Sequence, residues 1–516
     1  MPTNEIVRGR MRHSRRRPSI VLFGVAGAVG LLGLIPLGYV AATAVSMGWP
    51  TLSALIFRPR VGELLVNTLG LVIIAVPACL LIGVAAAWLV QRTNVPFARV
   101  FAPLLVAPLA MPAFVSSYGW VSSVPSLNGL GAGVLISTLS YYPLVYLPCA
   151  AALKRLDPSI EESAASLGLG SWAIFFRVIV PQLRLPLVGG ALLVGLHLLA
   201  EYGAFALIRF STFTTAIVEQ YQSTFNGPAA AALAGVLVLC CLVLLVAESG
   251  ARGRCRYARI GSGAARLARR QQLNGWAPVG TAFLVIVLAL AVGVPFASVL
   301  RWLIAGGARA WGDDAVLSSL FTTVGYGIGG SLVTVALAFP IAFLAVRRPS
   351  RASRALESVN YVTSSLPGIV TALALVTVAI RIAQPLYQTV ALVILVYVLL
   401  YLPRAIVSLR AGLAQVPPGL EEAAQSLGRN RVRAFVSVTG RYVGPSALTG
   451  AALVFLGIAT ELTSTLLLAP SGTRTLATQF WSQVNDIDYV GAAPFATMLV
   501  ALSLPATYFL FARDPR

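Results

Sequence analysis

Twelve long apolar segments constrain the fold of this chain more than any other feature of its sequence. A helix needs about 20 predominantly apolar residues to cross a bilayer, and inside lipid a helix satisfies its own backbone hydrogen bonds. The segments do not alternate between polar and apolar residues, which argues against a barrel of strands. They cover roughly residues 20–45, 63–90, 100–122, 129–152, 187–208, 229–248, 277–300, 317–346, 355–380, 386–409, 443–469 and 491–512. We therefore expect an all-α polytopic membrane protein with about 12 transmembrane helices.

The basic residues are distributed unevenly between the loops. With twelve spans and a cytosolic N-terminus, 31 of the 38 Lys and Arg residues fall on cytosolic segments. Such an excess sets the orientation of a membrane protein, so we expect both termini in the cytosol. The basic runs "RMRHSRRRPS" and "ARGRCRYARIGSGAARLARR" could instead bind RNA or anionic lipid. As topology signals at a membrane surface they need no nucleic-acid partner, and we favour that interpretation.

The chain is internally duplicated. A shift of 255 residues aligns "YPLVYLP" from Tyr142 with "YVLLYLP" from Tyr397. After a five-residue insertion, a shift of 260 aligns Glu201 with Glu461. Each unit contains six spans, an even number, so both copies enter the membrane from the same side. We expect two parallel six-helix pseudo-repeats, related by a pseudo-two-fold axis along the membrane normal, and a path for solute along that axis.

This organisation divides the chain into five predicted regions. Each six-span copy is divided between a flanking region, which holds its first span, and a unit that holds the other five. The regions are residues 1–62 (a cytosolic basic tail, the first transmembrane helix and an outer loop), 63–248 (the first unit), 249–316 (a cytosolic linker, the seventh transmembrane helix and an outer loop), 317–512 (the second unit) and 513–516 (a cytosolic tail).

A small polar stretch interrupts the apolar sequence once in each unit, on the cytosolic side between the fourth and fifth spans. "EESAASLGLGSWAIFFRVIVP" begins at Glu161, and "EEAAQSLGRNRVRAFVSVTGR" begins at Glu421. Each predicts a short surface helix that ends at a glycine, Gly168 or Gly428. Such helices could rest on the bilayer, but they carry Ala and Ser instead of large apolar anchors. Two copies related by a two-fold axis favour a docking site for a two-fold cytosolic partner.

The start of the first surface helix has two possible signals. Ser159 and Glu162 have the spacing of a capping box. Alternatively, Asp157 precedes Pro158, and proline is favoured at the first position of a helix.

These two stretches resemble the E-A-A-x-x-x-G signature of the permease subunits of bacterial ATP-binding-cassette importers. The chain looks like a type I permease with its two halves fused. In that family the loop is a coupling helix that fits a cleft in a cytosolic ATPase. The second copy departs from the pattern, since Arg441 stands where Pro181 would fall and the proline is displaced to Pro445. The resemblance assigns ATPase coupling to Glu161, Glu162, Ala164, Gly168, Glu421, Glu422, Ala424 and Gly428.

The resemblance also implies location and partners. A permease of this kind lies in the bacterial cytoplasmic membrane, binds a dimer of ABC ATPase subunits in the cytosol, and receives its solute from an extracytoplasmic substrate-binding protein. The residues agree that the ATPase is a separate chain. A phosphate-binding P-loop needs G-x-x-x-x-G-K-[ST], and the single lysine, Lys154, lies in "AALKRLD". We expect no cofactor, and the five cysteines show no metal or disulfide spacing.

Among the acidic residues of the apolar segments we single out Glu201 and Glu461, which lie in the fifth span of each half. Intramembrane acids usually face a cavity or a partner. These two could line the translocation path together with Tyr202 and His197, or bond to a nearby helix end at the outer interface. His197 is one turn from Glu201, and a packing role is favoured over a pH or metal role.

The substrate is suggested by a second resemblance. "AEYGAFALIRFSTFTTAI" and "TELTSTLLLAPSGTRTLATQFWS" look like the corresponding regions of fused ferric iron permeases. Oxygen-rich groups suit hard cations such as ferric iron, although they do not select it. Permeases for thiamine, polyamines, sulfate and molybdate share the architecture. An ion-coupled secondary transporter or a membrane enzyme would need more charged or catalytic residues in the spans, and both are disfavoured.

Overall fold

The computed structural model describes residues 20–252, 271–312 and 314–512. Among these residues, eight helices are long and apolar enough to cross a membrane. Three further pairs of helices, each bent by more than 40° at a short break, raise that number to 11 when each pair counts as one span. A shorter apolar helix over Tyr489–Pro505 falls on the last expected segment. Each of the twelve apolar segments therefore coincides with a helix or a bent pair, which confirms the all-α polytopic fold.

The first half of the chain contains sixteen helical elements in this order. They are α1 (Ile20–Ile56), α2 (Pro59–Arg92), α3 (Ala98–Leu104), η1 (Ala107–Ala110), α4 (Ala113–Ser123), α5 (Gly129–Tyr141), α6 (Pro143–Arg155), α7 (Pro158–Ser166), α8 (Ser171–Ile174), η2 (Phe175–Ile179), α9 (Val180–Gln182), α10 (Arg184–Ala200), α11 (Gly203–Leu207), α12 (Phe213–Val218), η3 (Glu219–Ser223) and α13 (Gly227–Arg252).

The second half repeats this order, so that α16 corresponds to α2, α20 to α7, α22 to α10 and α23 to α11. Its elements are η4 (Asn274–Trp276), α14 (Ala277–Leu288), η5 (Ala289–Gly293), α15 (Val294–Gly306), η6 (Gly307–Trp311), α16 (Asp314–Arg347), α17 (Arg351–Ser364), α18 (Gly368–Arg381), η7 (Gln384–Leu386), α19 (Val390–Ala414), α20 (Pro418–Ser426), α21 (Arg431–Ser437), α22 (Thr439–Ala459), α23 (Thr463–Leu468), α24 (Leu476–Asn485) and α25 (Tyr489–Ala512).

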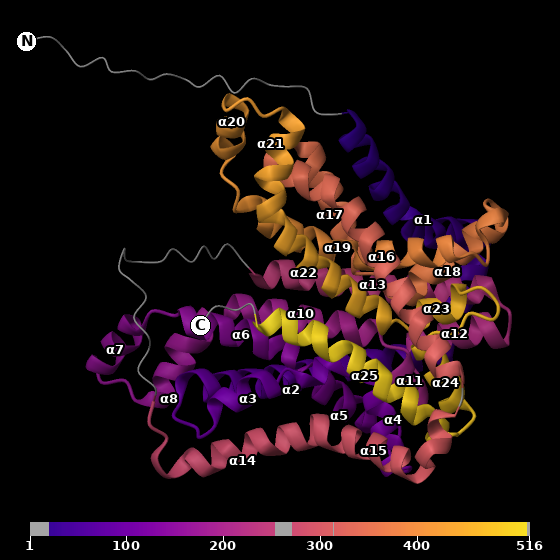
Figure 1. Cartoon of the computed structure of the whole chain (residues 1–516). Coiled ribbons are helices and arrows are strands. Elements are labelled where there is room, and N and C mark those ends of the chain that lie inside the picture. The colour runs from indigo at the N-terminus through magenta and orange to yellow at the C-terminus, as the bar shows by residue number, and fades with distance from the viewer. Residues whose placement is uncertain (1–19, 253–270, 313, 513–516) are drawn as a thin grey trace, which may run out of the picture.

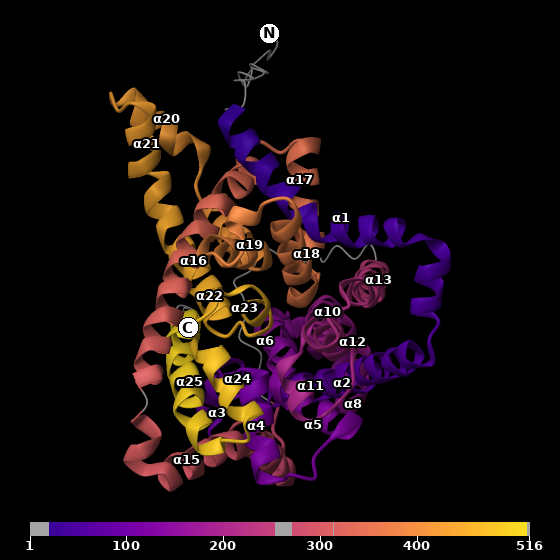
Figure 2. The same ribbon diagram turned by 90° about the vertical axis from the view of Figure 1, so that its right-hand side faces the viewer.

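The two halves exchange their first helices. Helix α1 packs against α16, α17 and α18 of the second half, where Ala26 and Val29 join the buried core. Figure 2 shows α1 leaving that half to lie beside α13. Helix α15 packs in turn against α4 of the first half. Small residues permit the close approach, since a Cβ at Gly119 would lie 2.5 Å from the Cα of Pro295.

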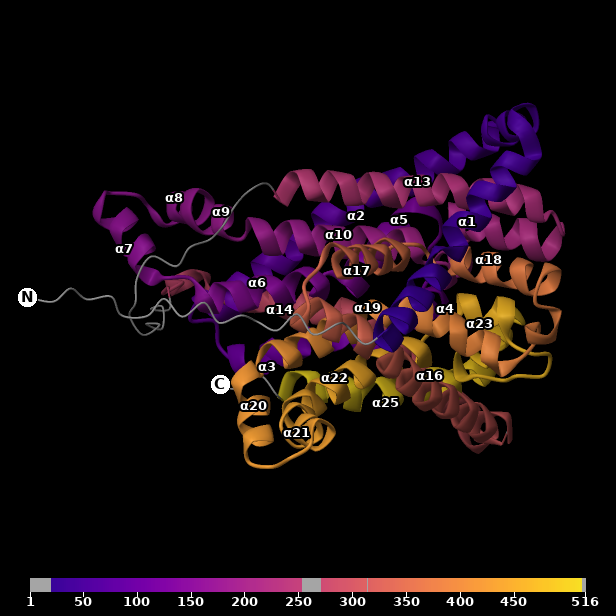
Figure 3. The same cartoon turned by 90° about the horizontal axis from the view of Figure 1, so that it is seen from above.

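A shared apolar core joins the halves at one end of the molecule. It includes Phe114 and Tyr118 from the first half and Phe480 and Trp481 from the second. The hydroxyl of Tyr118 donates to the backbone carbonyl of Tyr489 at 2.7 Å. Figure 1 shows the halves meeting around α11, α12, α23 and α24 and diverging toward α7 and α20. Both α7 and α20 project at the same end of the molecule, opposite α18 and α23 (Figure 3).

Several predicted features lie outside the described residues. These are the basic tail over residues 1–19, most of the linker including Cys255, and the tail over 513–516. Of the other cysteines, Cys79, Cys149 and Cys241 are buried, as small core residues would be.

Candidate functional site

The first surface helix, α7, begins at Pro158 and not at the alternative capping box. The Oδ1 atom of Asp157 accepts a hydrogen bond from the backbone N–H of Ser159 at 3.0 Å, so Asp157 is the cap. Proline at the first helical position leaves Ser159 inside the first turn, where it cannot act as the cap. The Ser159–Glu162 capping box is therefore wrong, and the alternative start at Asp157 is confirmed.

Both surface helices end at the predicted glycines, with the same geometry. Gly168 and Gly428 each have φ of +85°. The N–H of Gly168 donates to the carbonyl of Ala165 at 3.0 Å, and the next N–H, that of Leu169, donates to Ala164 at 3.2 Å. The corresponding bonds at Gly428 have the same lengths. This is a Schellman ending, in which a left-handed residue favours glycine.

The first glutamate of each surface helix forms an ion pair with the end of a long helix of its own half. Glu161 lies 3.0 Å from Arg92, the last residue of α2. Glu421 lies 3.1 Å from Arg347, the last residue of α16. The arginine side chains are 5% and 14% exposed, so these pairs are largely removed from solvent. Glu421 also accepts a hydrogen bond from the hydroxyl of Thr439.

The second glutamates point differently. Glu162 and Glu422 are exposed, whereas Glu161 and Glu421 are half-buried against their own chain. Burial raises the pKa of the Glu161 carboxyl, the positive charge of Arg92 opposes that rise, and Glu162 adds to it. Each helix thus presents one carboxylate to its own half and one to the outside.

The apolar side chains of the surface helices also divide into a buried group and an exposed group. Ala164 is buried and Ala424 is half-buried, while Leu167 and Leu427 are 83% and 84% exposed. Ala164 and Leu167, which are three positions apart on the helix, therefore have different surroundings, and so do Ala424 and Leu427. This arrangement leaves a large apolar side chain exposed at the tip of each helix, at equivalent positions.

Arginines 92 and 347 were missed as site residues, although a signal was present. The shift of 255 residues aligns "AAAWLVQR", which ends at Arg92, with "PIAFLAVR", which ends at Arg347. We had counted both arginines only as cytosolic charges, although they occupy equivalent positions in the repeat.

The intramembrane acids, Glu201 and Glu461, each connect two helices. Glu201 follows the last residue of α10 and accepts hydrogen bonds from the hydroxyl of Tyr141 at 2.6 Å and from the N–H of Ala204 at 2.9 Å. Glu461 accepts from the hydroxyl of Tyr401 at 2.8 Å and from the N–H of Ser464 at 3.0 Å. Each carboxylate therefore bonds to the start of the next short helix and to the fourth span.

The turns at Glu201 and Glu461 lie close together, where the two halves of the molecule converge. A Cβ at Gly203 would lie 2.9 Å from Leu462, and the ring of Tyr202 lies 5.3 Å from that of Trp481. His197 lies nearby, with its ring 5.4 Å from that of Tyr141. The structure thus brings Glu201, Tyr202 and His197 to the contact with the second half, close to Glu461.

One side chain at this contact was not singled out from the sequence. The guanidinium of Arg404 lies 4.8 Å above the ring of Tyr401, which is the tyrosine that donates to Glu461. The Nδ1 atom of His197 lies 2.8 Å from the carbonyl oxygen of Leu193, a contact expected of a packing histidine. Among the described residues there is no group of three or more His, Cys, Asp or Glu side chains that could hold a metal ion.

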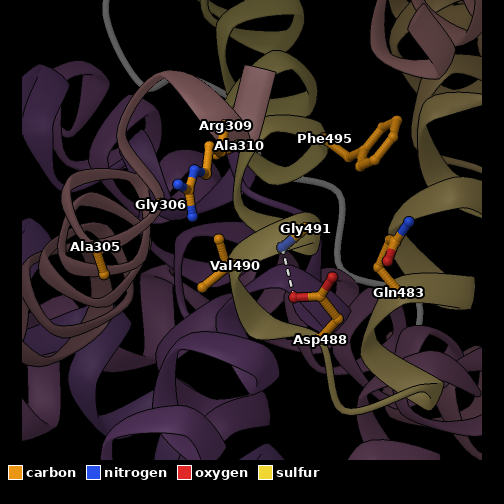
Figure 4. A pocket seen from close by; sticks show the side chains of 9 residues that line it. All are labelled: Ala305, Gly306, Arg309, Ala310, Gln483, Asp488, Val490, Gly491 and Phe495. Carbon is orange, nitrogen blue, oxygen red and sulfur yellow. Dashed lines mark hydrogen bonds between the residues drawn. The ribbon is translucent and has the colours of Figure 1, made fainter. Parts of the chain in front are cut away.

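A pocket of about 380 Å³ lies near the end at which the halves meet, between α15, η6 and the start of α25. Arg309, Gln483 and Asp488 supply its polar groups, and Asp488 accepts a hydrogen bond from the N–H of Gly491 at 2.8 Å (Figure 4). A pocket of about 280 Å³ occupies the equivalent place in the first half, where Arg58, Arg60 and Glu219 contribute. Both halves therefore carry a mixed polar pocket opposite their surface helix.

The fold and these sites define a duplicated helical membrane protein with a projecting surface helix on each half and a carboxylate-linked corner where the halves meet. Residues 35–248 and 334–516 match the family described as binding-protein-dependent transport system inner membrane component. The chain belongs to this family. It is a permease subunit with two fused halves, as the two matched segments show, and it is not itself the ATPase.

The relatives agree with this assignment. The chain is 36% identical over 491 residues to the Fe(3+)-transport system permease protein FbpB 2 of Haemophilus influenzae, covering 95% of this chain and 97% of the relative. It is 22% identical over 420 residues to the ferric transport system permease protein FbpB of Actinobacillus pleuropneumoniae, covering 77% of this chain and 60% of that protein. It is 30% identical over 202 residues to the sulfate transport system permease protein CysW of Synechocystis, covering 35% and 72%. The predicted resemblance to fused ferric iron permeases is confirmed, and so is the multi-span inner-membrane class.

Proposed function

We propose that this protein is the membrane permease of an ATP-driven importer that moves ferric iron into the cytoplasm. One observation carries the coupling role: α7 and α20 have the same length of 9 residues, the same glycine ending and the same glutamate–arginine attachment. Both project from the same end of a molecule whose halves diverge there (Figures 1 and 3). A dimer of identical ATPase subunits needs two such equivalent contacts.

The ATPase-coupling residues are those of the two surface helices. Glu162 and Glu422 face outward together with the exposed Leu167 and Leu427, which suits contact with a cytosolic ABC ATPase dimer. The remaining residues hold the helix in place, through Glu161, Glu421, Ala164, Ala424, Gly168 and Gly428. In this proposal α7, α20 and both termini of the chain face the cytosol, which agrees with the excess of basic residues predicted on that side.

The opposite end of the molecule faces an extracytoplasmic substrate-binding protein in this proposal. ATP binding closes the ATPase dimer and draws α7 and α20 together. The halves then separate around α11 and α23, where Glu201, Tyr202, His197 and Glu461 line the path. Hydrolysis returns the halves to the arrangement of Figure 1.

Ferric iron is favoured over other solutes by two observations. The ferric iron relative matches 95% of this chain, whereas the sulfate relative matches 35%. In addition, Glu201, Glu461 and their tyrosine partners are oxygen groups, which suit a hard cation in transit. Sulfate is the second candidate, since Arg404 at the same contact is a cation that an anion would meet.

The test is uptake by the permease reconstituted with its ATPase and binding protein. Radiolabelled ferric iron, sulfate, thiamine and spermidine are supplied separately, each with and without ATP. ATP-dependent accumulation of iron alone is the expected result. ATP-dependent accumulation of another solute would contradict the substrate, and uptake driven by an ion gradient without the ATPase would contradict the class.

A further inference from the structure

The attachment of each surface helix to its own half has a further consequence. We propose that the ion pairs Arg92–Glu161 and Arg347–Glu421 are the links that pass the movement of α7 and α20 to the long helices α2 and α16. Arg92 and Arg347 are then positioning residues, which act through the glutamates and contact neither solute nor ATP. This inference rests on the proposed coupling function and assigns two residues to it that the sequence motif does not contain.

Few other contacts attach the surface helices to the membrane bundle. Helix α7 packs mainly against α8 and η2, the segment that follows it, and α20 packs mainly against α21. Most of their side chains are exposed. The glutamate–arginine pairs connect them instead to helices that precede them by more than 60 residues in sequence. A displacement of either surface helix therefore acts directly on the end of α2 or α16.

Helices α2 and α16 extend from the surface helices to the opposite end of the molecule. Each contains 34 residues, which at 1.5 Å per residue is about 50 Å and exceeds the thickness of a bilayer core. Helix α2 packs along α5, α6 and α10, and α16 packs along α19 and α22. At its far end α2 lines the pocket of the first half through Val61 and Leu64. A force on Arg92 thus reaches the opposite end of the molecule through one continuous helix.

The chemistry of a buried ion pair suits it to transmitting movement. A largely buried ion pair contributes little net stability, because removing two charges from water offsets their attraction, and apolar contacts would hold the helices as well. Its best-attested use is to fix one arrangement among several. The Arg92 side chain is 5% exposed, so the unpaired charge would be costly in any arrangement that separates it from Glu161. Such an ion pair therefore keeps the surface helix at a fixed position on the end of the long helix when the surface helix moves.

The neighbouring glutamates support this division of roles. Glu161 and Glu421 face their own chain, whereas Glu162 and Glu422, one residue later, are exposed. On a helix, adjacent residues point about 100° apart. One carboxylate can therefore hold the permease while the next contacts the ATPase.

The experiment measures the number of solute molecules taken up per ATP hydrolysed, in proteoliposomes holding the full chain, the ATPase and the binding protein. Glu161→Gln and Glu421→Gln keep the shape of the side chain and remove its charge. Each variant is expected to lower uptake per ATP at least tenfold while the ATPase still copurifies with the permease. The matched control is Glu63→Gln, which removes the exposed 2.9 Å pair with Arg60 at the other end of α2 and is expected to change the ratio less than twofold.

A double-mutant cycle separates a link from two independent structural roles. The double variant Arg92→Gln/Glu161→Gln is expected to be no worse than either single variant, because the pair acts as one unit, and the same holds for Arg347→Gln/Glu421→Gln. Unchanged uptake per ATP in both glutamate variants would overturn the inference. Multiplicative losses, or loss of the copurified ATPase in proportion to uptake, would also overturn it, since they would indicate folding or docking instead of transmission.

The failure of the proposed function has a different signature. The ratio is measured with whichever solute the wild-type complex accumulates, so a wrong substrate leaves the inference intact. No ATP-dependent uptake of any solute by the wild-type complex would overturn the proposed function, and the inference with it.

Discussion

The surface helices α7 and α20 have the same backbone but different surroundings. Glu421 has two partners, Arg347 and the hydroxyl of Thr439. Glu161 has Arg92 alone within the described chain, and its buried Oε1 atom lies at ion-pair distance without a hydrogen bond. The position equivalent to Thr439 is Ile179, which lacks a hydroxyl. The features that both halves keep are thus the ion pair and the glycine ending, and these are the features we assign to coupling.

A second difference concerns the segments that contact the ends of α2 and α16, next to the glutamate–arginine pairs. In the first half, the end of the linker returns to the end of α2: the N–H of Gln271 donates to the carbonyl of Arg92 at 2.7 Å, and that of Leu273 donates to Asn94 at 2.8 Å. At the end of α16, the carbonyl of Arg348 accepts a hydrogen bond from the hydroxyl of Ser353, near the start of α17. The end of α2 is thus bonded to the linker, whereas the end of α16 is bonded to the helix that follows it.

The glycine endings are expected to give the largest effect, and to give it in both halves. Gly168→Val and Gly428→Val force a β-branched residue to φ of +85°, at a cost of about 1–3 kcal/mol, and displace the end of the surface helix. Uptake by either variant is expected to fall at least tenfold in the reconstituted system.

Two other glycines provide controls for this prediction. Gly170 and Gly419 also have no neighbour within 4 Å of an added Cβ, and neither has a positive φ. Gly170→Ala and Gly419→Ala should change uptake less than twofold. Full uptake in both valine variants would contradict the assignment of the surface helices, and an effect in one half alone would break the equivalence of the halves.

The intramembrane acids should come next. Glu201→Ala and Glu461→Ala each remove an acceptor for a tyrosine hydroxyl and a backbone N–H. Hydrogen bonds to charged groups contribute about 1.5–3 kcal/mol, so both variants should be less stable to thermal unfolding in detergent and both should transport less. A tenfold difference in uptake between the two variants would show that only one carboxylate serves the path.

A smaller effect is expected from the extra partner of Glu421. Thr439→Val keeps the shape and removes the hydroxyl that Glu421 accepts, a loss of about 1 kcal/mol. Uptake per ATP should fall by threefold or less, which would leave Arg347 as the main attachment. A loss as large as that of Glu421→Gln would mean that the threonine, and not the arginine, holds the second helix.

Removing the hydrogen bonds between the end of the linker and the end of α2 should give the smallest effect. Asn94→Ala removes the bonds to Leu273 and Gln272, the latter at 2.7 Å. Hydrogen–deuterium exchange over residues 271–273 should become faster, while uptake should stay within twofold of the wild type. A large loss of uptake would show that these hydrogen bonds take part in coupling.

Much of the fold could be predicted because apolar length and repetition are explicit in the sequence. The twelve segments located the spans, and paired glycines located the ends of both surface helices. The exchange of α1 and α15 between the halves could not be predicted, because an apolar pattern does not reveal which neighbour a helix packs against. It depends on local close approaches such as Gly119 against Pro295.

The tyrosine partners of the intramembrane acids show where alignment of the repeats fails. The shift of 255 residues pairs Tyr401 with Tyr146, yet Glu201 bonds to Tyr141. The fourth span of the first half, Gly129–Arg155, is divided into α5 and α6 at Tyr142, whose φ and ψ remain helical. In the second half α19 continues unbroken. The equivalent hydrogen bonds to Glu201 and Glu461 are therefore donated by tyrosines that the 255-residue shift does not align. The structure was needed to identify them.

Cross-linking from the tips of the two surface helices tests the central claim most directly. Leu167→Cys and Leu427→Cys place thiols at the exposed ends of α7 and α20, in a chain whose Cys255 is replaced by serine. If these helices couple the permease to an ATPase dimer, each thiol will cross-link to one ATPase subunit, and the double variant will capture two ATPase subunits per chain. Capture from one helix only, or from neither, would contradict the account.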